Sequence, residues 1–328
     1  MGKIVAVTGV NSYFASTVLP KLAADPEVER IVGIDVTGWK GSIDKMDFHR
    51  VDVRSKEMFA LLKGVDTLYH LAFIVGEIHD KEKTYDININ GSKNVFTAAA
   101  EGKVRKVIYT SSATAYGARA DNPLGIKEDR RLRPNEDSYY SLSKAEVESF
   151  VRGFFANHPD ILLTVLRAGL CVGPHIDNLF SRFWSRRASI FLWGRHPHLQ
   201  LIHEEDLGEA LYLAMQKDLP GIYNVAADDA VATRWVFEKA GVKLVNLPGR
   251  FLKAASNVAF ALRLEEVSQG WLSLCEHTIH VNSDKFKKAA GWEPAYSSET
   301  AYLHYLAHRD RSKPTSGSQP MMLAGKPK

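Results

Sequence analysis

The sequence has little cysteine and no long hydrophobic run. Cys171 and Cys275 are the two cysteines among 328 residues, and such widely separated thiols provide neither a disulfide framework nor the spacing of a metal site. No stretch approaches the ~20 apolar residues that a membrane span requires. The first apolar run, Ile4 to Val7, is too short for a signal peptide. We therefore expect a protein of the reducing cytoplasm that does not enter a membrane.

The chain also lacks an excess of charge of one sign. Its net charge is +4, from 42 Lys and Arg against 38 Asp and Glu that are dispersed along the sequence. Nucleic-acid-binding proteins usually gather basic residues in tracts or on one face, so we expect no nucleic-acid partner. His196, His198 and His203 have no acidic or thiol partner at ligand spacing, so we expect no metal site.

Short β-branched runs alternate with longer amphipathic segments in the first half of the chain. The runs that read as buried strands are 4–7, 31–34, 67–71, 107–109 and 162–166. The segments that read as helices are 16–24, 55–63, 84–101 and 138–156. This repeated pattern predicts the α/β class, with a Rossmann-type doubly wound parallel sheet. From about residue 226 the pattern changes to a smaller, mainly helical region.

The turn after the first predicted strand is poor in glycine. A G-x-x-G-x-x-G pattern would begin at Gly9, but Ser12 and Ala15 stand in its other two places. Such a turn lets backbone amides and a helix N-terminus meet a pyrophosphate, and the Ser12 hydroxyl could donate to it. The predicted cofactor contacts of the turn are Gly9, Asn11, Ser12, Tyr13 and Phe14. An ordinary strand–turn–helix without a ligand is the alternative.

A carboxylate follows the second predicted strand. Asp35 lies about 26 residues after Gly9, near the spacing at which an acid binds the adenosine ribose hydroxyls. A carboxylate there would repel a 2′-phosphate, and neither of the next two residues is Arg, so we favour NAD over NADP. Asp52 and Val53 follow a short strand near 48–51 and could meet the adenine edge. Alternatively, Asp52 caps the next helix.

A possible proton-transfer pair lies in the stretch 138–148. If this stretch is helical, Tyr140 and Lys144 lie four positions apart and share a face. An adjacent cation favours phenolate over phenol, so we expect Lys144 to lower the pKa of Tyr140 toward the range of a useful acid or base. About one such Tyr-x-x-x-Lys pair is expected by chance, so the motif needs a cofactor site and a partner hydroxyl beside it.

Six motifs follow one another along the chain. They are His70-Leu71-Ala72, Asn88 to Val95, Tyr109 to Gly117, Tyr140-x-x-x-Lys144, Arg167 to Pro174 and Ile202 to Leu207. Together they resemble the extended short-chain dehydrogenase/reductases, the NAD-dependent epimerase/dehydratase group, over roughly residues 3 to 300. The resemblance implies further cofactor contacts at Leu71, Ala72, Asn88, Tyr140, Lys144 and Arg167.

The resemblance also implies the chemistry. Ser112 would bind the substrate oxygen, Tyr140 would exchange the proton, and Lys144 would hold the cofactor ribose while hydride passes between NAD and a secondary carbinol or ketone carbon. Thr114 is a predicted substrate contact. In isolation, Ser112 could instead be the polar end of a strand. Homodimers of such proteins form through helices like those at 84–101 and 138–156.

The resemblance and the change of pattern divide the chain into five parts. These are an NAD-binding Rossmann core at 1–169, a substrate-binding insertion at 170–198, a return to the core at 199–225, a C-terminal substrate-binding region at 226–310 and a flexible tail at 311–328, rich in Pro, Gly, Ser and Lys. Within the C-terminal region, 251–262 is expected to be an amphipathic helix, either over an apolar cleft or in the core.

The small-molecule substrate stays open between two classes. The run from Ser112 to Thr114 resembles that of 4-epimerases and lacks the acidic pair of 4,6-dehydratases, which favours a sugar nucleotide. Leu170 and Leu199, however, stand where sugar-nucleotide enzymes usually carry Asn and Arg. Their absence favours a non-nucleotide ketone or alcohol, as in the hydroxysteroid and dihydroflavonol-reductase branches.

A group of arginines could replace those missing polar residues. Arg182 and Arg186 lie among aromatic residues in 178–195, and Arg favours bidentate phosphate contacts. We predict Leu170, Arg182 and Arg186 as substrate contacts, with a solvated basic helix as the alternative for the arginines. A third, non-catalytic NAD-binding function is suggested by the glycine-poor turn alone.

Overall fold

The computed structural model describes most of the chain. The described residues are 2–39, 41–76, 80–192, 194–248, 252, 256–258, 262 and 269–309. Most of the helix predicted at 251–262 and the whole of the tail predicted at 311–328 lie outside the described residues.

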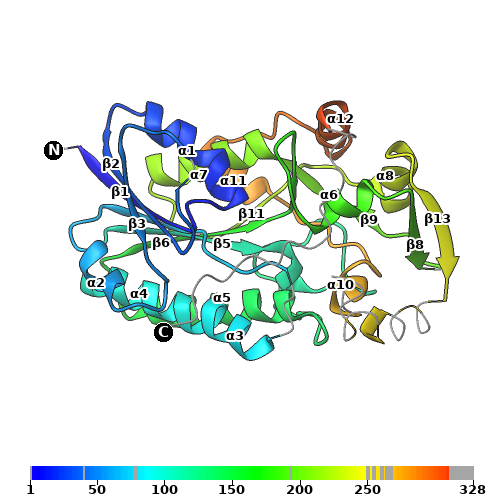
Figure 1. The fold of residues 1–328 in the computed structure, drawn as a ribbon, viewed down its shortest axis with the longest axis horizontal. Helices are drawn as coiled ribbons and strands as arrows, with labels where there is room; N and C mark the ends of the chain where they lie inside the picture. The colour runs from blue at the N-terminus through cyan, green and yellow to red at the C-terminus, as the bar shows by residue number, and fades with distance from the viewer. Residues whose placement is uncertain are drawn as a thin grey trace.

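A seven-stranded parallel sheet forms the centre of the molecule (Figure 1). Its strands, in spatial order, are β11 (Gly221–Val225), β6 (Leu162–Ala168), β5 (Lys106–Ser112), β4 (Thr67–His70), β1 (Lys3–Thr8), β2 (Val28–Asp35) and β3 (Met46–Arg50). All five strands predicted in the first half lie in this sheet, so the predicted fold class is confirmed. The order reverses between β1 and β4, where ligands of such sheets bind beyond the carboxyl ends of the strands.

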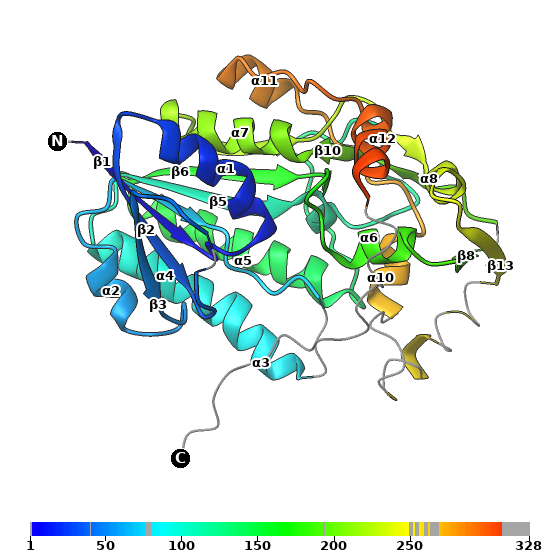
Figure 2. The same cartoon turned by 45° about the horizontal axis from the view of Figure 1, so that its top comes forward.

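Helices cover both faces of the sheet (Figures 1 and 2). One face carries α1 (Tyr13–Ala24), α7 (Glu204–Gln216) and α11 (Asp284–Ala290); the other carries α2 (Glu57–Leu61), α4 (Gly91–Glu101) and α5 (Tyr139–Ala156). Because both faces are covered, apolar residues fill the middle of β1: Val5, Ala6 and Val7 are fully buried.

The helix predicted at 84–101 begins earlier and is not a regular α-helix. It consists of α3 (Lys81–Tyr85), a π-helical turn at Asp86–Asn90 and α4. Single π-helical turns inside helices often occur at functional sites. Here the turn contains Asn88, one of the predicted cofactor contacts.

A second, smaller region packs against the carboxyl edge of the sheet, at the right of Figure 1. Its elements are β7 (Leu170–Val172), α6 (Leu179–Trp184), β8 (Ala188–Leu192), β9 (His198–Leu199), β10 (Leu201–His203), β12 (Val231–Ala232), α8 (Thr233–Lys239), β13 (Lys243–Leu247), α10 (Gln269–Leu274) and α12 (Ser298–His308). The strands form the pairs β7–β10, β9–β12 and β8–β13. Trp184, Tyr302 and Tyr305 are buried in its core.

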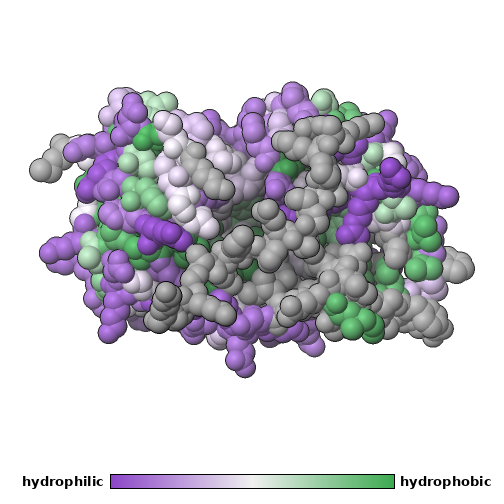
Figure 3. Space-filling model, viewed as in Figure 1, coloured by the Kyte–Doolittle hydropathy of each residue, from purple (hydrophilic) through white to green (hydrophobic). Residues whose placement is uncertain are grey.

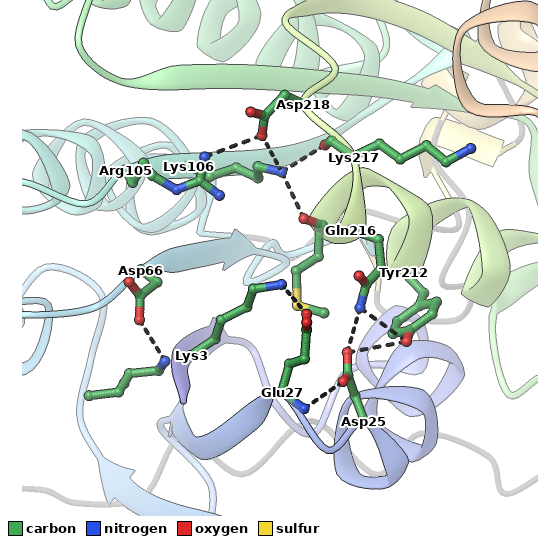
Figure 4. Close-up of polar contacts among 12 residues, drawn as sticks. Lys3, Asp25, Glu27, Asp66, Arg105, Lys106, Tyr212, Gln216, Lys217 and Asp218 are labelled. Atoms are coloured by element: carbon green, nitrogen blue, oxygen red, sulfur yellow. Dashed lines mark hydrogen bonds and ion pairs between the residues drawn. The ribbon is translucent and has the colours of Figure 1, made fainter. Parts of the chain in front are cut away.

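Buried polar contacts stabilise the opposite edge of the sheet, where the strands begin (Figure 4). The fully buried Lys106 ammonium donates to the carbonyls of Met215 and Lys217, at 2.7 Å each. Both carbonyls belong to the carboxyl end of α7, where helical C=O groups lack partners within the helix. Lys106 also pairs with Asp218 at 3.0 Å. These bonds hold α7 to β5, far along the strands from the carboxyl edge.

The surface mixes polar and apolar side chains (Figure 3). Apolar atoms gather at the end of the molecule where β13 lies, and Val245 and Leu247 of that strand are 44% and 37% exposed. None of the helices in the described part of the chain is both long and apolar enough to cross a membrane.

Candidate active site

The turn after β1 is shaped by its single glycine. Gly9 has φ +70°, and a Cβ at this position would lie 2.6 Å from the N and Cα of Ala72. This contact leaves no space for a side chain, and glycine is also the residue that adopts this φ freely. The Ser12 hydroxyl accepts a hydrogen bond from Ala15 N at 3.2 Å and so caps α1. That bond uses an oxygen lone pair and leaves the hydroxyl hydrogen for another acceptor.

Asp35, at the carboxyl end of β2, is tied to this turn. Its Oδ2 accepts from Asn11 N at 3.1 Å, and its Oδ1 accepts from Thr37 N at 2.9 Å. The Asn11 side chain in turn donates to Thr37 Oγ1 at 2.9 Å. Two residues predicted separately to contact the cofactor, Asn11 and Asp35, are thus side by side.

Arg50 is a neighbour of Asp35 that sequence reasoning missed. It is the residue of β3 paired with Asp35 of β2, and its Nε donates to the carbonyl of Val36 at 3.0 Å. The two positions after Asp35 hold Val36 and Thr37, so local spacing shows no arginine. The pairing of β2 with β3, rather than any local spacing, brings this cation to the same strand ends.

Asp52, which follows β3, lies in a cluster of ion pairs. It pairs with Arg54 at 2.6 Å, which lowers the pKa of its carboxyl group, and Arg54 also pairs with Asp86 at 2.6 Å. The helix-capping alternative is wrong, because the N-cap of α2 is Lys56 and no side chain caps it. Val53 is buried.

Three further predicted cofactor contacts surround the end of β4. Leu71 is buried, and the half-buried Ala72 faces Gly9. The Asn88 amide accepts from Ile74 N at 2.8 Å and donates to Ile74 O at 3.0 Å. Asn88 therefore fixes the loop that follows β4.

Tyr13 and Phe14, from the first turn of α1, are half-buried, and the Tyr13 hydroxyl donates to Glu204 at 2.5 Å.

Ser112 and Tyr140 are brought together at the end of β5. The Tyr140 phenol lies beside the Ser112 hydroxyl, which opposes the rise of its pKa. Thr114 donates to Ser112 Oγ from its backbone N, at 3.2 Å, and from its Oγ1, at 2.9 Å. Ser138 caps α5 by accepting from the N of Ser141, which starts the helix where Tyr140 can reach Ser112.

Lys144 lies one turn along α5 from Tyr140. Its ammonium donates to Thr110 O at 2.9 Å and lies 3.6 Å from the ring centre of Phe73. Burial among these groups lowers the pKa of Lys144 to about 7, because a desolvated ammonium is disfavoured.

The expected lowering of the pKa of Tyr140 is not found. Burial raises the pKa of Tyr140 to about 12, and the Ser112 hydroxyl opposes that shift only in part. The Lys144 ammonium lies 5.9 Å from the Tyr140 ring centre. The four-residue spacing correctly placed both groups on one face, but it carried no information about how deeply the phenol is buried.

Arg167 has partners inside the protein. Its side chain is 1% exposed and forms a buried ion pair with Glu148 of α5, with Nε 3.0 Å from the carboxylate. It also donates to the hydroxyl of Tyr116. The same Glu148 accepts from Ser111 Oγ at 2.9 Å. These contacts join β5, β6 and α5, and the predicted contact of Arg167 with the cofactor stays a prediction.

Three predicted substrate residues, Leu170, Arg182 and Arg186, lie in the second region, whereas Thr114 follows β5. Leu170 begins β7 and packs in an apolar cluster that also contains Leu199 and Phe180. Arg182 pairs with Asp177 at 3.6 Å. The Arg186 guanidinium lies 4.7 Å from the ring centre of Phe183.

No metal centre is formed by the described residues. None of their His, Cys, Asp and Glu side chains form a group of three or more that could hold an ion. Cys171 and Cys275 are free thiols.

These features fit a dinucleotide. The turn at Gly9 packs closely against the backbone of Ala72, the N-terminus of α1 follows it, and Asp35 stands at the end of the adjacent strand. This is the arrangement that receives a pyrophosphate and a ribose.

Comparison with known proteins agrees with this class of site. Residues 5–226 match the NAD dependent epimerase/dehydratase family. The chain therefore belongs to this family, and is an NAD-dependent enzyme of the epimerase/dehydrogenase type.

Three curated relatives indicate the range of the family. The chain is 24% identical to the uncharacterised protein Rv0501 of Mycobacterium tuberculosis, over 94% of this chain and 84% of the relative. It is 27% identical to 2-alkyl-3-oxoalkanoate reductase of Shewanella oneidensis, over 63% and 53%. It is 23% identical to dTDP-D-glucose 4,6-dehydratase of Mus musculus, over 89% and 84%.

Solved structures share the fold. MoeE5 in complex with UDP-glucuronic acid and NAD has a TM-score of 0.75 and 17% identity, over 94% of this chain and 98% of that one. UDP-glucose 4-epimerase of Thermotoga maritima, with UDP-glucose, has a TM-score of 0.74 and 19% identity, over 93% and 98%.

Proposed function

We propose that this enzyme interconverts a secondary alcohol and a ketone, with Ser112, Tyr140 and Lys144 as its catalytic residues. The position of the Tyr140 phenol beside the Ser112 hydroxyl, at the end of β5 and one turn from Lys144, is the observation that carries the proposal. Bound NAD supplies the hydride acceptor and donor. The protein orients the substrate and moves the proton.

Each catalytic group has a defined task. Ser112 donates to the substrate oxygen, with its own hydroxyl held by Thr114. Tyr140 gives a proton to that oxygen in reduction and takes it in oxidation. Its raised pKa keeps the phenol protonated for the role of acid, and the role of base needs a phenolate that a neighbouring cation stabilises. Protonated Lys144 holds the ribose and stabilises the phenolate by its charge.

The cofactor contacts of the proposed site lie along four strand ends. Gly9, Asn11 and Ser12 would hold the pyrophosphate, and Asp35 the adenosine ribose, which supports NAD as the cofactor rather than NADP. We keep Asp52, Val53, Leu71, Ala72 and Asn88 as contacts proposed for the adenine and nicotinamide sides.

Two substrate classes have support. Structural neighbours crystallised with UDP-sugars, at 17–19% identity, favour a sugar nucleotide and hence an epimerase. The apolar setting of Leu170 and Leu199 favours a non-nucleotide ketone or alcohol, as does the likeness to 2-alkyl-3-oxoalkanoate reductase. Net change in NADH absorbance with added substrate selects the second class; isomerisation without net NADH change selects the first.

Replacement of the phenol tests the mechanism. We expect Tyr140→Phe to lower kcat about 10²- to 10⁴-fold, the usual contribution of a positioned acid or base, with NAD affinity nearly unchanged. The control is Tyr139→Phe, on the adjacent residue of α5. Wild-type turnover by Tyr140→Phe would refute the proposed mechanism.

We also propose that the enzyme is a cytoplasmic homodimer that associates through α4 and α5. Leu142 of α5 and Tyr85 of α3 are 37% and 39% exposed, which supports an apolar contact there. Sedimentation of the wild type and of Leu142→Glu tests the dimer: the variant should shift toward the monomer.

A further inference from the structure

Four aromatic rings form a row through the candidate site. Phe73 meets Tyr140 edge-on, with ring centres 5.9 Å apart, and Tyr140 stacks on Trp271 at 5.6 Å with 18° between the ring planes. Trp271 in turn meets Phe180 edge-on at 5.8 Å. Offset stacking and edge-on contacts are the favoured geometries of aromatic pairs. The catalytic phenol thus belongs to a continuous aromatic wall.

The helix that carries Trp271, α10, contacts the residues that immediately precede α5, the helix of Tyr140 and Lys144. A Cβ on Gly270 would lie 2.2 Å from Asp137 O and 2.7 Å from the Cα of Ser138, the N-cap of α5. Gln269 and Ser273 both donate to the Asp137 carboxylate, at 3.0 and 2.5 Å. The position of Trp271 is therefore coupled to the start of α5.

Trp271 has a donor without an acceptor. The side chain is buried, with 5% of the residue exposed, and its indole N–H has no hydrogen-bond partner among the described residues. A buried N–H without a partner is costly, and most such groups have one. A ligand oxygen would remove that cost.

The side chains beyond the wall are apolar. Phe180 packs in the same cluster as Leu170 and Leu199. Hydrocarbon surface of a ligand would be desolvated favourably here, whereas a diphosphate would lose hydration without gaining a charged partner from these three residues.

We infer that Trp271 determines substrate specificity. Its ring forms an apolar wall beside Tyr140, and its N–H binds a second oxygen of a ketone or alcohol with a hydrocarbon or aromatic body, apart from the oxygen that Ser112 and Tyr140 hold. This inference rests on the proposed function and decides between its two substrate classes.

Two substitutions of Trp271 distinguish the contribution of its aromatic ring from that of its indole N–H. Trp271→Phe keeps an aromatic ring and removes the N–H, and Trp271→Leu removes both. Trp235→Phe is the matched control, because Trp235 belongs to the same region but contacts Tyr302. Ethyl benzoylacetate, which has a ketone and an ester oxygen, 2-octanone and UDP-glucose are titrated by calorimetry into each protein saturated with NAD, and NAD-linked oxidation of ethyl 3-hydroxy-3-phenylpropanoate gives kcat and KM.

We expect the wild type to bind both ketones at least 10-fold more tightly than UDP-glucose. Trp271→Phe should weaken binding of ethyl benzoylacetate about 3- to 10-fold, the effect of one neutral hydrogen bond, with KM raised and kcat within about twofold. Trp271→Leu should weaken it further, and Trp235→Phe should match the wild type. Tighter binding of UDP-glucose, absence of ketone binding, or wild-type affinity in Trp271→Phe would overturn the inference.

Tyr140→Phe separates the two proposals. If it turns over substrate like the wild type, the proposed function fails. If it is inactive while Trp271→Phe binds and turns over like the wild type, only the role of Trp271 fails.

Discussion

Two adjacent serines at the end of β5 have different partners. Ser112 accepts from Thr114 and lies beside the Tyr140 phenol, whereas Ser111 donates to the buried carboxylate of Glu148. The side chains of successive strand residues point to opposite faces, so the two hydroxyls cannot share a task. One serves the proposed chemistry and the other the packing of β5 on α5.

This difference predicts opposite effects of the same substitution. Ser112→Ala should lower kcat about 10²-fold, the effect of losing one transition-state donor, with little change in stability. Ser111→Ala should retain kcat but lower the free energy of unfolding by about 1–3 kcal/mol, because Glu148 loses a buried donor. Steady-state kinetics and urea unfolding on both variants measure the two effects. A loss of activity in Ser111→Ala as large as in Ser112→Ala would contradict the assignment.

Lys144 makes stability depend on pH. Burial lowers its pKa from 10.5 to about 7, so the unfolded chain binds this proton more tightly than the folded one. Its contribution to stability is therefore complete above pH 10.5 and is lost as the pH falls to about 7. Relative to Lys144→Met, the wild type should gain up to about 1.4 kcal/mol per pH unit within that window. Urea unfolding of both proteins at pH 7, 8.5 and 10 tests this; a constant difference would be contrary to it.

At the scale of elements, the turn between β1 and α1 depends on one glycine. Gly9 needs both a positive φ and the space that Ala72 leaves for it. Gly64 has a similar φ, +77°, but an added Cβ there would meet nothing within 4 Å. Comparison of Gly9 with Gly64 therefore distinguishes the cost of backbone strain from the cost of a steric clash.

Alanine at each glycine should therefore have unequal effects. Gly64→Ala should cost about 1 kcal/mol in the free energy of unfolding, from strain alone. Gly9→Ala should cost more and weaken NAD binding at least ~10-fold, because the clash moves the turn away from the strand ends. Calorimetric titration with NAD and urea unfolding give both quantities, and equal effects at the two positions would disprove the role of the clash.

The elements differ in how well the sequence predicted them. Strands such as β1 and β2 are set by local runs of apolar residues, and the serine before α5 marks its start, so local patterns were enough. The π-helical turn around Asn88 was missed, because it has no pattern of its own. The contacts of Arg50 with the end of β2 and of Trp271 with Tyr140 arise from pairing and docking between distant segments, which periodicity does not encode. The pKa of Tyr140 was mispredicted for a related reason: burial depends on everything packed around it.

At the scale of the molecule, Lys106 holds the amino edge of the sheet. Lys106→Met would leave the carbonyls of Met215 and Lys217 without their donor. We expect a loss of about 2–4 kcal/mol in the free energy of unfolding from these two buried groups. Arg105→Met removes an exposed pair with the same Asp218 and should cost less than about 1 kcal/mol. Urea unfolding compares them, and kcat should be unchanged in both; equal losses of stability would contradict the buried role of Lys106.

The parallel direction of the strands places the proposed site at one edge of the sheet and the stabilising contacts of Lys106 at the other. In a parallel sheet every strand begins at one edge and finishes at the other, so the contacts of Lys106 lie at the end opposite Ser112 and Asp35. Substitutions around Trp271 and in α6 would leave intact the hydrogen bonds of Lys106 that hold α7 to β5. The acceptance of new substrates and the retention of the fold are then largely independent, which makes the second region the natural place to redesign this enzyme.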